Sequence, residues 1–435
     1  MRLLTSVTTS VKQRLAVRVL ERTMKDGLDL RRLRFFPDSF KVPFKRDGLD
    51  PNPELTALRE TEPVTKLTEL FGRGIWLVTG YDEARTVLAS GDDFSNDLAQ
   101  FVPQEGRDPK DHVGGLGMTD PPGHTRLRRY LTPEFTKKRL ARMQPVIERV
   151  VDERLDAMEE AGPEADLVQD FAFPVPFEVI CELLGLPVED RATFHRLGVA
   201  RFDLSTGSSG SFDAAGQSRD FLIRAVARQR EEPGPGLIGA LLRDHGDELD
   251  DVTLGGLADG VFLGGYETSA SMLALGAYLL ADNPEAMDLV RGDDETVDRV
   301  VEELLRHLTV VQLAFVRFAR RDVEIGGRQL RAGDAVGVSL LAANRDPALG
   351  PDLDRFDPHR APTRHLAFGH GLHRCVGSEL ARMELRIALR ALATRFPDLR
   401  VTVDPAELEF RKMSAVYGVA ALPVSLYAEE TQQAS

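Results

Sequence analysis

The sequence is most informative at Phe368-Gly369-His370-Gly371-Leu372-His373-Arg374-Cys375-Val376-Gly377. Beyond this stretch, Leu380, Met383 and Ile387 recur at helical spacing and predict a helix over 376–396. Cys375 therefore lies in a glycine-rich loop just before a helix N-terminus. Free N–H groups and the helix dipole favour a thiolate there, so we expect a lowered pKa for this thiol. Gly371 and Gly377 would let the backbone approach a flat or bulky group.

Three interpretations of this loop compete. An ordinary loop with a chance cysteine does not account for the glycine spacing. A zinc site would use four ligands crowded into a short segment, which fits poorly with the usual paired spacing, and the chain has no H-E-x-x-H; the ligands would be His365, His370, His373 and Cys375. The third interpretation is a single cysteine thiolate on a haem iron.

Composition narrows the class of protein. The chain has 435 residues with 42% hydrophobic content, enough for a large core, and a net charge of −14 that argues against a general nucleic-acid binder. Its two cysteines do not suggest a disulfide scaffold. No stretch approaches the ~20 apolar residues of a membrane span, and no secretory segment begins the chain. We therefore expect a cytoplasmic protein without a membrane span.

Charge and periodicity divide the chain. Residues 1–48 hold 12 Lys and Arg against 5 Asp and Glu, so we expect a basic N-terminal arm over 1–50 and a single domain over 51–435. The domain is predicted to be mainly helical, with the connector 205–211 between two helices. The predicted helices are 133–160, 212–232, 251–281, 285–308 and 376–396. The predicted strands are 75–78, 323–325 with a turn at Gly326-Gly327, and 335–341.

Two local sequence patterns do not indicate functional sites. Gly234, Gly236 and Gly239 match G-x-G-x-x-G, but a charged helical run precedes them instead of the strand that dinucleotide binding requires. Cys181 lies in an apolar helical segment and is interpreted as a buried small hydrophobe.

The predicted helix 251–281 has an unusual composition. It holds several glycines, including Gly264 and Gly265 just before Glu267 and Thr268, and glycine is costly inside a helix. Close approach of a flat ligand would offset that cost, and so would tight packing of helices. Both interpretations remain open on composition alone.

The cysteine segment resembles the haem-binding loop of the cytochrome P450 superfamily, F-x-x-G-x-x-x-C-x-G. Phe368, Gly371, Cys375 and Gly377 occupy its fixed positions, and the resemblance extends over about 51–425. It implies a mainly α fold with small β-sheets, shaped like a triangular prism, with the haem between a long central helix and the Cys-loop helix. It also implies haem b (heme b, iron protoporphyrin IX), with Cys375 as the iron ligand and Phe368 and Gly369 against the cofactor.

Three further segments are similar to family motifs. Gly264, Gly265, Glu267 and Thr268 match the oxygen-binding motif, which implies that Glu267 and Thr268 deliver protons to O₂. Glu303 and Arg306 match E-x-x-R, and Arg360 matches the arginine that completes a structural triad. Four residues occupy positions where the family binds the haem propionates: His124, Arg128, Arg317 and His373.

The resemblance implies a monooxygenase that inserts one oxygen atom of O₂ into a mostly apolar organic substrate. The chain has no flavin or nicotinamide motif, so ferredoxin and ferredoxin reductase are the expected partners. Secondary-metabolite tailoring is the expected role, with lipid or terpenoid catabolism as the alternative and a peroxide-driven or non-catalytic relative as less favoured ones. The expected docking face is the basic run Arg126, Arg129, Lys137, Lys138, Arg139 and Arg142. The expected pocket comprises the loop 95–117 and Leu257, Val261, Phe262, Val311, Gln312, Phe315, Val416 and Tyr417.

Overall fold

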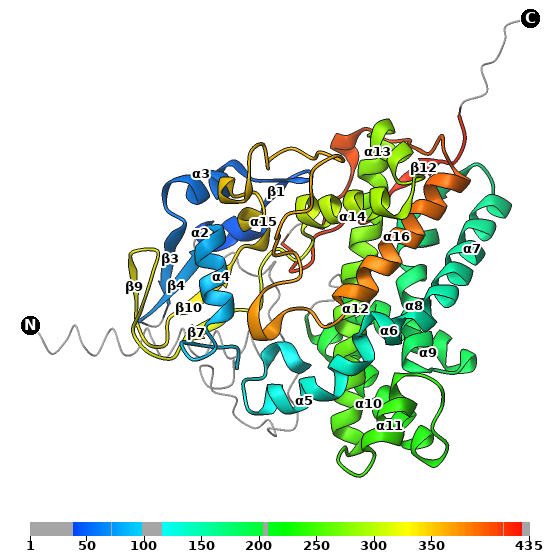
Figure 1. The fold of residues 1–435 in the computed structure, drawn as a ribbon, viewed down its shortest axis with the longest axis horizontal. Coiled ribbons are helices and arrows are strands. Elements are labelled where there is room, and N and C mark those ends of the chain that lie inside the picture. Colours follow the sequence, from blue (N-terminus) through cyan, green and yellow to red (C-terminus); the bar gives the residue numbers. More distant parts are fainter. Residues whose placement is uncertain (1–37, 71, 98–114, 203–207, 412, 429–435) are drawn as a thin grey trace, which may run out of the picture.

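Helices form most of the chain in the computed structural model, which describes residues 38–70, 72–97, 115–202, 208–411 and 413–428. The mainly α prediction is confirmed, with the largest sheet at one side of the molecule (Figure 1). The α-helices are α2 (Asp38–Lys41), α3 (Pro53–Thr61), α4 (Tyr81–Ala89), α5 (Gly123–Leu131), α6 (Lys137–Leu140), α7 (Gln144–Ala161), α8 (Pro174–Leu184), α9 (Val188–Phe202), α10 (Ser208–Glu231), α11 (Leu237–His245), α12 (Asp251–Ala281), α13 (Pro284–Leu289), α14 (Asp294–Leu308), α15 (Leu340–Ala343) and α16 (Ser378–Arg395).

The strands are short and form several small sheets. The largest has the order β3-β4-β10-β7-β5, in which β10 runs parallel to β4 with Ala335 opposite Ile75. The strands are β1 (Arg46–Asp47), β2 (Asp50–Pro51), β3 (Val64–Leu70), β4 (Arg73–Val78), β5 (Phe94–Ser95), β6 (Glu164–Asp166), β7 (Arg317–Ala319), β8 (Val323–Ile325), β9 (Arg328–Leu330), β10 (Ala335–Val338), β11 (Arg400–Val401) and β12 (Pro423–Ser425).

Helix α12 contributes many side chains to the larger hydrophobic core. Its N-cap Asp250 accepts a hydrogen bond from the Thr253 N–H, and the helix packs against α8, α10 and α16. Most of its C-terminal half is buried in the larger hydrophobic cluster, while a second cluster lies around the sheet. Within the described residues, none of the helices combines the length and apolarity needed to cross a membrane.

Several predicted boundaries need correction. The segment 133–160 is not one helix, because the extended backbone at Thr136 separates the turn 132–135 from α6, and Pro145 lies at the start of α7. The segment 285–308 is interrupted after α13, and α14 restarts behind its N-cap Asp293. The connector 205–211 was predicted too long, because α10 already begins at Ser208.

The N-terminal boundary also moves. Residues 1–37 of the predicted arm lie outside the described residues, but residues 38–50 pack onto the domain. Val42 and the pair β1–β2 belong to this packed segment, and Val42 is buried. The folded part therefore begins before residue 51.

Candidate active site

The cysteine loop is held between two helices. It contains a short 3-10 turn, η10 (Gly371–His373), and the Cys375 N–H donates to the Phe368 carbonyl at 2.9 Å. Gly371 has φ +70°, and a Cβ there would lie 2.5 Å from the Leu88 carbonyl oxygen near the end of α4. Close packing against α4 therefore explains this glycine, in place of the predicted approach to a ligand.

Cys375 is exposed to solvent, although surrounding protein atoms partly desolvate its thiol. The residue is exposed, yet burial by surrounding protein is the largest effect on the pKa of the thiol and raises it. The Gly377 N–H and the charges of Arg128, Arg374 and Arg382 oppose that effect. The expected lowering of this pKa is thus wrong for the free thiol. Coordination to a metal ion would deprotonate it.

The glycines of α12 serve two purposes. A Cβ at Gly265 would lie 2.7 Å from Ile180 of α8, and one at Gly255 would lie 2.6 Å from Ile223 of α10, so both allow close helix packing. A Cβ at Gly264 would meet nothing within 4 Å. Open space therefore adjoins α12 at Gly264, one turn before Thr268.

The two polar residues Glu267 and Thr268 on α12 have different kinds of partner. The Thr268 hydroxyl donates to the Gly264 carbonyl at 2.6 Å. Glu267 is largely buried and pairs with Arg411 at 2.9 Å, a partner that the sequence did not suggest. Burial raises the pKa of the Glu267 carboxyl, while the Arg411 charge acts to lower it. A buried carboxyl with a raised pKa is suited to taking up and giving up protons.

Basic side chains gather near the cysteine loop. His124 of α5 is fully buried, and its ring lies 4.3 Å from that of His373. Burial, reinforced by His124 and Arg317, lowers the pKa of His373 to about 4. Arg317 is also buried, and burial lowers its pKa to about 10. Arg128 is close enough to Cys375 for the two groups to perturb each other's pKa.

This basic cluster has unmet hydrogen-bonding capacity. Both ring nitrogens of His124 and Nδ1 of His373 find no partner within the described part of the chain. The nearby carboxylate of Asp120 is occupied by Ser95, the Asn96 N–H and Arg320. Buried donors that lack acceptors are costly, so the cluster is suited to binding anionic groups.

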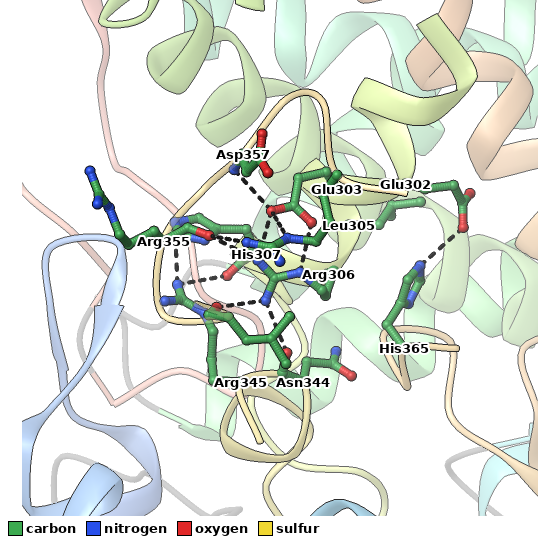
Figure 2. Close-up of polar contacts among 12 residues, drawn as sticks. Glu302, Glu303, Leu305, Arg306, His307, Asn344, Arg345, Arg355, Asp357 and His365 are labelled. Atoms are coloured by element: carbon green, nitrogen blue, oxygen red, sulfur yellow. Dashed lines mark hydrogen bonds and ion pairs between the residues drawn. The ribbon is translucent and has the colours of Figure 1, made fainter. Parts of the chain in front are cut away.

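Glu303 is the centre of a buried ion-pair network (Figure 2). Its carboxylate receives two bonds of 2.7 Å from Arg306 and one of 3.1 Å from Arg360. The Asp357 N–H donates to the same carboxylate at 3.1 Å. The structure thus brings together the three residues that the resemblance placed in a triad.

The expected pocket residues fall into two groups. Val311 and Val416 form a β-bridge between their segments, and Phe315 is exposed and lies against Gly117. Leu257 is buried and Val261 half-buried on α12. Most of the loop 95–117, residues 98–114, lies outside the described residues.

Three of the expected pocket residues lie in the packed core. Phe262 stacks among the rings of Phe194 and Tyr266. Gln312 is fully buried and bonds Arg46 and the Ser414 carbonyl, whereas the Tyr417 hydroxyl donates to the Gly48 carbonyl. Phe262 is thus packed among aromatic rings, and the polar groups of Gln312 and Tyr417 are bonded within the chain, so the prediction that these three residues face a substrate is corrected.

Comparison with known proteins decides the family. The family model described as Cytochrome P450 matches residues 222–416. The chain is 40% identical over 393 residues to cytochrome P450 165B3 of Amycolatopsis orientalis, covering 88% of this chain and 97% of that protein. It is 38% identical to the monooxygenase PikC of Streptomyces venezuelae, covering 86% and 91% of the two chains. The structure of OxyC, implicated in oxidative C–C coupling during vancomycin biosynthesis, superposes with a TM-score of 0.81 at 39% identity over 89% of this chain and 97% of that one.

The chain belongs to the cytochrome P450 family. It is a cytochrome P450 monooxygenase with the fold of the bacterial members, and bacterial members typically work with redox partners. The family implies a haem. The residues present fit one, because an exposed thiol, open space beside α12 and buried basic groups without acceptors match an iron ligand, a flat macrocycle and two propionates.

The zinc alternative conflicts with the geometry. Nε2 of His365 lies 3.0 Å from Glu302, and its Nδ1 accepts from the Ala367 N–H. His365 is thus engaged away from Cys375 and does not complete a tetrahedral set. Cys181 is fully buried, as predicted, and burial raises the pKa of its thiol.

Proposed function

We propose that this cytochrome P450 binds haem b through the thiolate of Cys375 and inserts one atom of O₂ into a mostly apolar organic molecule. The observation that carries this proposal is the exposed thiol of Cys375 beside a cluster of buried basic groups that lack acceptors. When bound, the haem supplies the oxidation chemistry, and a thiolate ligand favours cleavage of the O–O bond.

The cofactor's carboxylates would be held by His124, Arg128, Arg317 and His373. A charge-assisted hydrogen bond to a propionate would satisfy one open ring nitrogen of His124 and one of His373. Phe368 and Gly369 would lie against the macrocycle at the start of the loop, and Gly264 and Gly265 would lie along α12. Glu303, Arg306 and Arg360 would act structurally, by fixing the loop that precedes the cysteine segment.

Thr268 and Glu267 would deliver protons during turnover. The Thr268 hydroxyl can rotate from the Gly264 carbonyl toward an oxygen acceptor in the open space beside that glycine. Glu267 lies next to it in sequence on α12 and has a carboxyl whose pKa burial raises. A carboxyl of this kind can replenish the proton that the hydroxyl gives up.

The substrate class is proposed to be a secondary metabolite. OxyC is named for vancomycin biosynthesis, and a second relative is the mycinamicin IV hydroxylase/epoxidase of Micromonospora griseorubida. Leu257, Val261, Val311, Phe315 and Val416 would supply apolar contacts, as is usual for sites that bind organic ligands. Electrons would come from ferredoxin and its reductase.

The test of this function is the fate of electrons in Thr268→Ala. The variant should bind haem as wild type does but divert electrons into peroxide. Its share of electrons ending in product should fall at least about tenfold, since a positioned proton donor contributes on the order of a hundredfold or more. Thr253→Ala, on the same helix near its N-terminus, is the matched control. Unchanged coupling in Thr268→Ala would remove this hydroxyl from the reaction.

A further inference from the structure

Helices α14 and α16 are joined by a ladder of ion pairs. Both helices contribute one residue every four positions, and the two series run in opposite directions, so the helices are antiparallel along this contact. The pairs are Glu302–Arg382, Asp298–Arg386 and Asp294–Arg390. The acid side chains are 19%, 59% and 76% exposed in that order, so only the first pair is shielded from water on its acidic side.

The shielded pair has a third member. His365 is almost fully buried, and its Nε2 lies 3.0 Å from the Glu302 carboxylate (Figure 2). Because Nδ1 of His365 accepts the Ala367 N–H at 3.2 Å, the ring proton sits on Nε2 and is donated to Glu302. The carboxylate is thus bonded at once to α16 and to the segment that leads into the cysteine loop.

Arg382 carries the contact on to the cysteine loop. Its guanidinium lies 4.6 Å from the ring centroid of Phe368, within cation–π range. The Phe368 carbonyl in turn accepts the Cys375 N–H at 2.9 Å. Arg382 is also one of the cations whose charge favours the thiolate form of Cys375.

Glu302 is ionised in this setting. Burial raises the pKa of its carboxyl, but the His365 hydrogen bond and the Arg382 ion pair outweigh burial and hold the pKa at about 2. One negative charge therefore balances Arg382 close to the cysteine loop. Its neighbour Glu303 points to a different partner set, Arg306 and Arg360, so the two adjacent carboxylates hold different parts of the chain.

We propose that Glu302, His365 and Arg382 form a positioning unit that fixes Phe368 and the Cys375 thiolate and sets the electrostatic environment of the bound iron. The proposal rests on the proposed function, because it takes Cys375 as the iron ligand. None of the three residues is proposed to touch substrate. Neutralising Glu302 leaves the charge of Arg382 unbalanced, which favours the reduced iron and shifts its midpoint potential to more positive values.

The test compares Glu302→Gln with Asp298→Asn, which removes the same charge from the next, exposed pair of the ladder. Two quantities are measured on haem-loaded protein without substrate. They are the midpoint potential of the iron, and the rate at which the carbon monoxide complex loses its thiolate-type spectrum on warming. We expect a positive potential shift and about a tenfold faster spectral loss in Glu302→Gln, because breaking a shielded pair leaves its partner unsatisfied. Asp298→Asn should match wild type in both.

Arg382→Lys provides an independent readout if Glu302→Gln yields no folded protein. Lysine keeps the positive charge but loses the planar group over Phe368 and the two-point contact with Glu302. Faster spectral loss in Arg382→Lys than in Asp298→Asn would support the positioning unit. Equal behaviour of the position-302 or position-382 variant and Asp298→Asn would overturn it. A wild-type protein without a thiolate-type spectrum would instead contradict the proposed function itself.

Discussion

Glu384 of α16 is a buried acidic residue to which the proposed function assigns no role. The residue is 2% exposed, and its Oε1 finds no hydrogen-bond partner within the described residues. Burial raises the pKa of its carboxyl from 4.5 to about 8. The folded protein therefore holds a proton here across a pH range in which the unfolded chain has released it. Above the unfolded pKa, this group lowers stability, and the penalty grows until the pH passes the folded pKa.

Replacing Glu384 by Gln should remove that pH dependence. From about pH 5.5 to about pH 7.5, wild type should lose stability relative to the variant by about 1.4 kcal/mol per pH unit. Urea unfolding of both proteins at these two pH values measures the difference. Glu379→Gln, a partly exposed position on the same helix, should follow wild type. A constant gap between wild type and Glu384→Gln would show that Glu384 is ionised in the folded protein.

Single residues show what the sequence can and cannot predict about the site. Cys375 and Glu303 stand in motifs that the family resemblance identifies, and it also placed Arg360 beside Glu303 although the two are 57 positions apart in sequence. Arg411 pairs with Glu267 across 144 positions of sequence, and no local sequence pattern predicts this ion pair. Gln312 and Tyr417 were placed on the pocket wall because they stand in segments expected to line it, but partners within the chain take up their polar groups.

At the scale of elements, α5 carries two exposed arginines that differ in whether they form an ion pair within the described residues. Arg129 is paired with Glu248 at 3.3 Å and also bonds the Tyr130 hydroxyl. Arg126 is exposed and forms no ion pair with any acid in the described residues. Both border a shallow hollow of about 600 Å³ with Pro121, Pro122 and Thr125. Arg126 is thus better placed than Arg129 to meet an acidic partner.

Charge reversal at Arg126 should weaken electron transfer from ferredoxin. At low salt, the apparent second-order rate of reduction by a ferredoxin should fall about tenfold in Arg126→Glu, and its salt dependence should flatten. Arg129→Glu should have a smaller effect, since Arg129 is already engaged within the chain. Arg128→Glu should instead impair haem retention. Rapid-mixing reduction at several ionic strengths measures these effects, and parallel salt slopes for Arg126→Glu and wild type would place the docking face elsewhere.

Helix boundaries were predictable where capping and periodicity agree. The helix 251–281 matches α12 because Asp250 caps it and no proline interrupts it. The segment 133–160 has helical periodicity throughout, yet the extended backbone at Thr136 and Pro145, which has no N–H to donate, divide it. Periodicity alone does not reveal such breaks, whereas Pro145 could have indicated one of them.

At the scale of the whole molecule, Arg46 joins three distant parts of the chain. Its guanidinium donates to the carbonyls of Leu308 and Thr309 at the end of α14 and to Gln312 Oε1, and it lies 4.3 Å from the ring centroid of Tyr417. Burial lowers its pKa to about 9. These partners lie more than 260 residues away in sequence, so the basic composition of the predicted arm did not indicate that Arg46 is half-buried and bonded to them.

Loss of this side chain should destabilise the fold. Arg46→Ala leaves buried carbonyls without donors, and we expect its free energy of unfolding to fall by about 3 kcal/mol. Lys45→Ala, which removes the same charge from an exposed neighbour, should change it by less than about 0.5 kcal/mol. Chemical unfolding of the three proteins measures both. A similar small loss in the two variants would mean that the Arg46 contacts contribute little.

The central claim is that Cys375 is the ligand of a haem iron, and the carbon monoxide spectrum of the reduced protein tests it most directly. Cys181→Ala is the matched control, because it removes the other thiol of the chain from a buried position on α8. We predict a thiolate-type spectrum for wild type and Cys181→Ala and its loss in Cys375→Ala. A thiolate-type spectrum that survives in Cys375→Ala, or disappears in Cys181→Ala, would contradict the assignment.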